Sequence, residues 1–253
     1  MNKYFYFLIS IFLFINYSFS DEKNYIATIT EVKGNVFIIK EDTKKSIKAK
    51  EYTPLEQTDT VKTGQKSSCE ITFDDGSIIV LQSDTEVCLE KFKQQKNLRL
   101  KKGKLLSSII KQTTTEYSNI RTPTCLIAVR GTEFAVDILS DEETNIGVFD
   151  GQIAVKHFIS EEEISEEEFL LDKDFETTIK LFEKPQQPVV LGERMKEYKK
   201  TIKLLNKRFE MIRKNLNKYR DLRIKQFEKY REKLENKRKN DLEKYRNRKT
   251  FKK

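Results

Sequence analysis

The chain has 253 residues, with 49 Lys and Arg against 40 Asp and Glu, and 35% of its residues are charged while only 37% are hydrophobic. This composition predicts that part of the chain lies outside any globular core. One histidine, His157, excludes sites built on two histidines, and three cysteines exclude a small fold held by disulfides. No paired catalytic carboxylates or metal-ligand cluster stands out, so we expect a non-enzymatic protein without a cofactor.

Residues 1–20 have the pattern of a secretory signal peptide. Lys3 supplies the positive start, an aromatic and aliphatic run follows, and the small residues Ser18 and Ser20 precede a predicted cut after Ser20. The apolar run is shorter than the about 20 residues of a membrane-spanning helix. An uncleaved anchor is the alternative. In either case we expect residues 21–253 outside the cytosol, in the periplasm or cell envelope of a bacterium.

Short segments with apolar side chains at every second position follow one another from residue 24 to residue 182. Turn residues separate many of them, including Asp75-Gly76 and Asp150-Gly151, in which glycine supplies the positive φ of a tight hairpin. Short strands with regular turns are typical of an all-β domain. The segment therefore predicts a mainly β fold.

Two turns in this β segment carry candidate chemistry. Arg130 either presents its guanidinium to a carboxylate or phosphate ligand or lies at a glycine bulge between two strands. Asp74 and Asp75 could bind a divalent cation, but their two carboxylates supply far fewer oxygen ligands than calcium prefers. We therefore interpret this segment as a hairpin turn. The motif residues that we expect to be structural are Asp75, Gly76, Ser77, Thr122, Pro123, Arg130, Gly131, Thr132, Asp150 and Gly151.

The cysteines differ in their predicted surroundings. Cys69 and Cys125 share strand faces with apolar residues and are expected to be buried, whereas Cys88 shares its face with glutamates and is expected to be exposed. An oxidising compartment permits one disulfide, and the sequence leaves open whether any pair forms. We expect His157 to be an exposed side chain without a catalytic partner.

Between Gly34 and Val155 the chain resembles the FecR domain. The strongest signals are the DGS turn with its flanking strands and the TP…VRGTEF segment. The matching segments are GNV (34–36), LEQTDTVKTGQKSSCEITFDDGSIIVLQSDTEVCL (55–89), LKKGKLL (100–106), IRTPTCLIAVRGTEFAV (120–136) and VFDGQIAV (148–155). The resemblance implies a compact β-sandwich or β-roll, with residues 169–179 as its last hairpin.

The chain departs from the FecR pattern at two turns and at its N-terminus. A glycine is expected near Asp174, and a Gly-Asp pair is expected where the chain has Thr58-Asp59. The best-known FecR-type proteins are iron-transport regulators, with a cytoplasmic helical region that acts on a sigma factor and a periplasmic FecR domain that senses a transporter. Here only three residues precede the apolar run. From the resemblance we therefore expect only that this chain shares the fold and the cellular compartment of the FecR domain. A periplasmic signal-transduction protein stays the alternative function.

The C-terminal part is predicted to be helical. From Leu191 onward there is no proline, and strong helix formers dominate. Apolar residues recur in alternating steps of three and four, and the pattern resumes at Phe227 after a stutter. The seam consists of Met195, Tyr198, Ile202, Leu205, Phe209, Ile212, Leu216 and Tyr219. It predicts a coiled-coil-like segment whose partner helix comes from a second copy, giving a homo-oligomer, or from the same chain folding back.

Charge is divided unevenly along the chain. Residues 193–253 hold 25 Lys and Arg against 9 Asp and Glu, a net charge of +16, whereas residues 21–192 have a net charge of −8. Such a segment either binds a polyanion and releases its counterions, or is the solvated exterior of a coiled coil. The expected partners are other envelope proteins or anionic cell-wall or membrane polymers, without nucleic acid. The proposed anion contacts are Lys237, Arg238 and Lys239.

These patterns together predict a non-enzymatic exported envelope protein. Its FecR-type domain would bind or scaffold, and its basic helical tail would oligomerise it or tether it to an anionic surface. The predicted organisation is a signal peptide, a FecR-like β domain, a linker and a basic helical tail, over residues 1–20, 24–182, 183–192 and 193–250.

Overall fold

The computed structural model describes residues 25–41, 43–90, 96–111 and 118–222, together with 224, 225, 228, 229, 232 and 236. The predicted signal peptide and the predicted anion contacts Lys237, Arg238 and Lys239 lie outside the described residues. In the part that is described, no helix combines the length and apolarity needed to cross a membrane.

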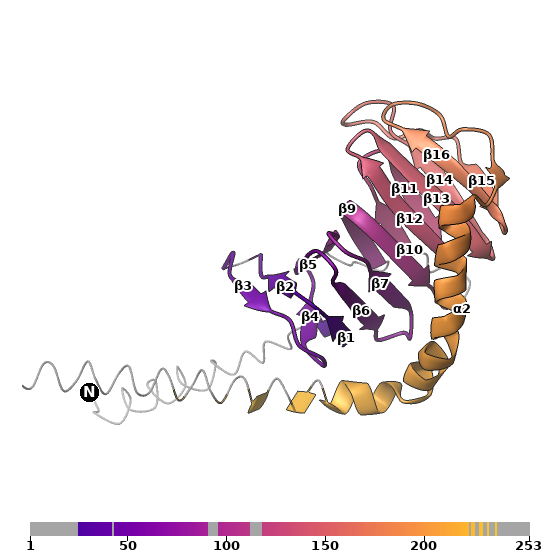
Figure 1. Cartoon of the computed structure of the whole chain (residues 1–253). Helices are drawn as coiled ribbons and strands as arrows, with labels where there is room; N and C mark the ends of the chain where they lie inside the picture. Colours follow the sequence, from indigo (N-terminus) through magenta and orange to yellow (C-terminus); the bar gives the residue numbers. More distant parts are fainter. Residues whose placement is uncertain are drawn as a thin grey trace, which may run out of the picture.

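The fold is mainly β, as predicted, and its strands form two sheets that enclose one core (Figure 1). One sheet, which we call the helix-covered sheet, contains β4 (Pro54–Glu56), β1 (Tyr25–Lys33), β6 (Ser68–Phe73), β7 (Ile78–Leu81), β9 (Lys96–Ser108), β12 (Glu133–Ser140), β13 (Glu143–Asp150), β16 (Phe175–Lys180) and β17 (Val189–Val190). The other, the open sheet, contains β3 (Ser46–Lys48), β2 (Val36–Ile39), β5 (Thr60–Thr63), β8 (Glu86–Leu89), the first half of β9, β10 (Ser118–Arg121), β11 (Cys125–Val129), β14 (Gln152–His157) and β15 (Phe169–Asp172).

Strand β9 joins the two sheets because its halves pair with different neighbours. Its first half pairs with β8 and, in parallel, with β10, whereas its second half pairs with β7 and β12. Gly103 lies where the strand passes from one sheet to the other, with φ +88°. A Cβ atom there would lie 2.5 Å from the backbone Cα of Thr85, so only glycine fits.

The side-chain alternation read from the sequence separates the core from the outer faces. Ile71 and Phe73 of β6 point into the core between the sheets and are fully buried. On β1, Ala27 and Ile29 point the same way, and a bulge between Ile29 and Glu31 then shifts the register. The segment predicted as the last hairpin contains β15 and β16, but these strands pair with different neighbours in different sheets, so they do not form a hairpin.

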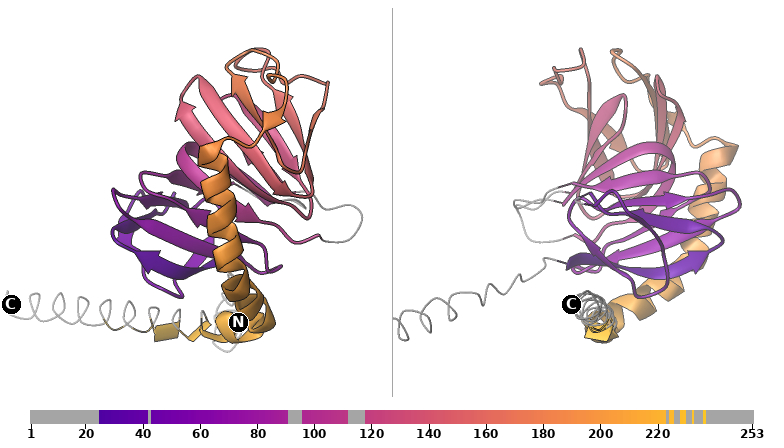
Figure 2. Two further views of the ribbon diagram at one scale, coloured as in Figure 1. Left: turned by 45° about the vertical axis from the view of Figure 1, so that its right-hand side comes forward. Right: turned by 90° about the vertical axis from the view of Figure 1, so that its left-hand side faces the viewer.

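Helix α2 (Glu193–Lys214) lies across the outer face of the helix-covered sheet (Figure 2). Four of its side chains, those of Met195, Ile202, Phe209 and Ile212, are buried with apolar side chains of the sheet. These sheet residues are Ile78, Val80, Leu106, Ala135 and Phe149.

Among the described residues the predicted coiled coil is not seen, because up to Ile212 the seam packs on the chain's own sheet. An apolar stripe with steps of three and four fits a sheet as well as a partner helix, so the spacing alone could not decide between them. The segment predicted as a linker, residues 183–192, contains β17, which pairs with β16. Helix α2 therefore follows directly from the sheet that it covers.

Both positions where the FecR pattern expects a glycine adopt the left-handed backbone conformation with another residue. Thr58 has φ +73° and Asp174 has φ +70°. A β-branched residue in this conformation is strained, by about 1–2 kcal/mol. We expect Thr58→Gly to raise the free energy of unfolding by about 0.5–1 kcal/mol, after the entropic cost of glycine is subtracted, as measured by urea denaturation.

The matched control for this substitution is Thr60→Gly, two residues along in β5. Thr60 is half-buried like Thr58 but has a strand conformation, so glycine there should lower the free energy of unfolding by about 0.5–1 kcal/mol. Equal losses at both positions would show that Thr58 is not strained.

Candidate functional site

The outer face of the helix-covered sheet holds the most unusual chemistry of the described structure, because two carboxylates are buried there under α2. Glu70 of β6 and Asp137 of β12 are each only 1% exposed. A buried carboxylate is costly unless a cation and hydrogen bonds compensate it. Helix α2 supplies both, at two separate points along its length.

Arg208 of α2 binds Glu70 through two nitrogens. Its Nε lies 3.1 Å from Oε2 of Glu70, and its Nη2 lies 3.3 Å from Oε1. The hydroxyl of Thr30 donates to Oε1 of Glu70 at 2.5 Å, and the Thr30 carbonyl accepts from Nη2 of Arg208 at 3.2 Å. Burial lowers the pKa of Arg208, but the hydrogen bond and charge of Glu70 outweigh burial and raise that pKa. The pair therefore holds α2 to β6 and β1.

Asp137 is the second point of attachment, near the start of α2. Its Oδ2 accepts a hydrogen bond from Nη1 of Arg194 and one from the hydroxyl of Tyr198, both at 3.2 Å. Burial, followed by the charge of Asp137 and this hydrogen bond, raises the pKa of Tyr198. Tyr198 therefore stays protonated and remains a donor to the carboxylate.

The sheet is also shaped to receive the helix. A Cβ atom added to Gly147 of β13 would lie 2.9 Å from Cγ and Sδ of Met195, so a larger residue would push the helix away. Just before α2, the amide of Gly192 donates to Oε2 of Glu176 at 2.8 Å. The start of α2 is therefore fixed by both packing and hydrogen bonds.

The chain stays attached to the β domain beyond the end of α2. Arg213 donates from Nε to the carbonyl of Gly76 at 3.1 Å and from Nη2 to the hydroxyl of Ser108 at 2.9 Å. Helix α2 ends at Lys214, and the backbone is helical again over residues 216–222 after a turn at Asn215. In this second helical stretch the ring of Tyr219 stacks on that of Tyr52, with centroids 5.9 Å apart. Arg220 then donates to the carbonyl of Asp74. The basic segment thus leaves the β domain from a defined place.

The structure brings three of the four predicted motif turns together, around the residues that follow β9. The amide of Ile110 donates to the hydroxyl of Ser77 at 3.3 Å, and the amide of Ile109 donates to the carbonyl of Thr132 at 3.0 Å. The hydroxyl of Thr132 in turn donates to the carbonyl of Gln152, next to the Asp150-Gly151 turn, at 3.0 Å. The turns at 75–77, 130–132 and 150–151 therefore support one another.

Individual motif residues make local contacts. Asp75 accepts hydrogen bonds from the amide and the hydroxyl of Ser77, at 2.9 and 2.8 Å, and pairs with Lys96. Nε of Arg130 is buried and has no hydrogen-bond partner among the described residues. Thr122 accepts from the amide of Cys125 at 3.1 Å. The Thr122-Pro123 turn lies at the opposite end of β11 from the 130–132 turn. Among the described residues, no group of three or more potential ligands is placed to hold a metal ion.

All three thiols are free. Cys69 and Cys125 are buried, as predicted, and burial raises the pKa of Cys125 to about 11, whereas Cys88 is half-buried rather than exposed. His157 is buried, so the prediction that it is exposed was wrong. His157 lies opposite Cys125 in the pairing of β11 with β14. Because the side chain of Cys125 is in the core between the sheets, that of His157 points to the same side.

The sequence did not reveal the helix attachment points Glu70, Asp137, Arg194 and Arg208. One signal for a covered outer face was present. Ile78–Leu81 is a run of four apolar residues, and such a run in a strand indicates burial on both faces. The run could have predicted that something covers this sheet, although not which residues bind the two carboxylates.

Comparisons with known proteins find one family model and solved structures that are similar to part of this chain. Residues 59–154 match the family model described as FecR protein. Two crystal structures of a proposed anti-sigma factor from Parabacteroides distasonis, at 1.65 and 2.50 Å resolution, each have a TM-score of 0.43 and 15% identity to this chain and cover 53% of it. This chain spans 59% of the length of each. A search of curated proteins finds no match. The matched residues include all four motif turns, and the chain therefore contains a FecR domain.

Proposed function

We propose that this chain is a non-enzymatic exported envelope protein, in which the FecR domain is a scaffold that holds a basic segment toward an anionic envelope surface. The observation that carries this proposal is the attachment of α2. Its buried side chains and the pairs of Arg208 with Glu70 and of Arg194 with Asp137 fix the place where the basic segment leaves the domain.

The distribution of charge around α2 supports the same proposal. Within the helix, lysines pair with nearby carboxylates, as Lys196 does with Glu193 and Lys200 with Glu197. Residues 215–253 then hold 16 Lys and Arg against 6 Asp and Glu, a net charge of +10. The excess of positive charge therefore lies mainly beyond the helix that anchors it. Cell-wall polymers, anionic lipid headgroups and acidic envelope proteins are the expected partners.

We expect the full mature chain to bind vesicles rich in anionic lipid, or isolated cell-wall polymer, with an affinity that falls steeply as salt rises. The triple charge reversal Lys237→Glu, Arg238→Glu and Lys239→Glu should weaken binding by about 100-fold or more, since each basic residue near an anionic membrane contributes about 1 kcal/mol. Co-sedimentation at several salt concentrations measures both effects.

The matched control reverses three exposed lysines of the β domain, Lys44, Lys45 and Lys48. It changes the net charge by the same amount and should leave binding nearly unchanged. Equal losses in both triple variants would indicate that only the net charge matters, and binding that is insensitive to salt would rule out the tethering role.

A signal-transduction protein of the periplasm is the second candidate, and the FecR domain match favours it. A strain without the protein should then change transcription of a defined gene set, and the tail charge reversal should restore that transcription as well as the wild type does. Oligomerisation through the seam after Ile212 stays a prediction.

A further inference from the structure

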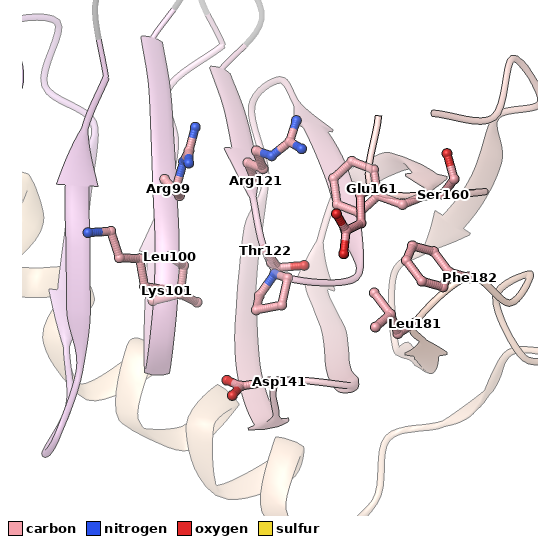
Figure 3. A pocket seen from close by; sticks show the side chains of 12 residues that line it. Arg99, Leu100, Lys101, Arg121, Thr122, Asp141, Ser160, Glu161, Leu181 and Phe182 are labelled. Carbon is pink, nitrogen blue, oxygen red and sulfur yellow. The ribbon is translucent and has the colours of Figure 1, made fainter. Parts of the chain in front are cut away.

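A cavity of about 410 Å³ opens at one end of the open sheet, on the side of the molecule opposite to α2. Its walls come from β9, the β10–β11 turn, the β12–β13 hairpin, and the segments that follow β14 and β16 (Figure 3). We call it the Phe182 pocket. A volume of this size is in the range of pockets for small molecules, about 300–1,000 Å³.

Arg121 is the basic residue of this pocket for which the described ranges show no ion pair. Its Cζ lies 4.4 Å from the ring centroid of Phe158, which holds the guanidinium in place. No carboxylate pairs with it in the described ranges, whereas its neighbours in the pocket are already paired, Arg99 with Glu90 and Lys101 with Glu86. A half-buried, oriented guanidinium without a carboxylate is suited to bind two oxygens of a carboxylate or a phosphate.

Phe182 gives the pocket an apolar wall. It is 44% exposed and has φ +61°, a conformation that aromatic residues rarely adopt. In Figure 3 its ring and the side chain of Leu181 lie across the cavity from Thr122. Backbone strain held at an exposed aromatic residue beside a cavity is typical of a binding site.

Two carboxylates also line the cavity, those of Asp141 and Glu161. Both are exposed, and neither forms an ion pair with Arg121. Asp141 lies at the far end of the cavity from Arg121 (Figure 3). The positive end and the apolar wall are therefore the features that select a ligand.

We propose that the Phe182 pocket binds a small organic anion, whose carboxylate or phosphate pairs with Arg121 and whose flat or apolar group packs on Phe182. This site is separate from α2 and from the basic segment. Its test is therefore independent of the tethering role, and either can fail alone.

The experiment is a heteronuclear NMR titration of the full mature chain with benzoate, phenyl phosphate and benzyl alcohol. The two anions should shift resonances of the pocket residues with a Kd on the order of 1 mM, as expected for ligands of this size. Benzyl alcohol should bind at least about tenfold more weakly, because it lacks the charge-assisted hydrogen bonds. A preference for phenyl phosphate would identify the natural oxyanion as a phosphate, and a preference for benzoate would identify it as a carboxylate.

Two variants and one control make the test specific. Arg121→Gln and Phe182→Gly should each weaken binding of the anions by about tenfold. Glycine suits φ +61°, so Phe182→Gly should fold with unchanged or higher thermal stability, and a loss of binding would not reflect unfolding. Lys156→Gln removes a charge from β14, two strands away from Arg121 in the open sheet and outside the pocket, and should bind as the wild type does. Equal binding of benzyl alcohol, unchanged binding in Arg121→Gln, or no shift at the pocket residues would overturn the proposal.

Discussion

Replacing Phe209 by alanine is expected to destabilise the protein by about 3–5 kcal/mol, the largest effect of any single substitution in α2. Phe209 is 1% exposed and belongs to the apolar cluster between α2 and the helix-covered sheet. Its removal leaves a cavity between two rigid elements, neither of which can close the gap. Urea denaturation of the full chain, followed by circular dichroism, measures the change in the free energy of unfolding.

Leu204→Ala is the matched control for Phe209→Ala on the same helix. Leu204 is 82% exposed, so its truncation should change the free energy of unfolding by less than about 0.5 kcal/mol. If Phe209→Ala were equally harmless, α2 would not be packed on the sheet in solution. If both were strongly destabilising, both faces of α2 would be covered, as in an oligomer.

The second large effect is expected for Arg208→Met, at about 3 kcal/mol, because this substitution leaves the buried carboxylate of Glu70 without its cation. Methionine keeps most of the apolar stem, so the loss reports on the charge rather than on packing. The control Lys207→Met removes the same charge at the next, exposed position and should be nearly neutral.

A double-mutant cycle separates the ion pair from other effects of the substitution. Once Glu70→Gln has removed the buried charge, Arg208→Met should cost about 1–3 kcal/mol less than it does in the wild type. Additive losses would mean that Arg208 and Glu70 do not interact, and would contradict the attachment of α2 described above.

Much of the β domain was predictable because its determinants are local. The alternation in β6 predicts that Cys69, Ile71 and Phe73 share one face, and this face is the core. Aspartate and glycine mark the 75–76 and 150–151 turns at the correct places. The position of each strand in a sheet was not predictable, since the division of β9 between two sheets depends on pairing with strands distant in the sequence.

The candidate site was less predictable because its contacts join residues that are far apart in the chain. Arg208 and Glu70 are separated by 138 positions, and nothing near Glu70 indicates a cation above it. The seam from Met195 to Ile212 correctly predicted an amphipathic helix, but it carries no information on whether a helix or a sheet covers it. The Phe182 pocket likewise combines five segments, of which the sequence singled out only the Thr122-Pro123 turn.

The central claim is that α2 and the FecR domain form one folded unit that fixes the start of the basic segment. Native-state hydrogen exchange of the full mature chain tests this claim most directly. The amides of residues 198–212 should exchange only through global unfolding, with the same free energy as those of β7 and β12. Exchange of α2 through a low-energy local opening, while the sheet stays protected, would show that the helix is a separate module and would contradict this account.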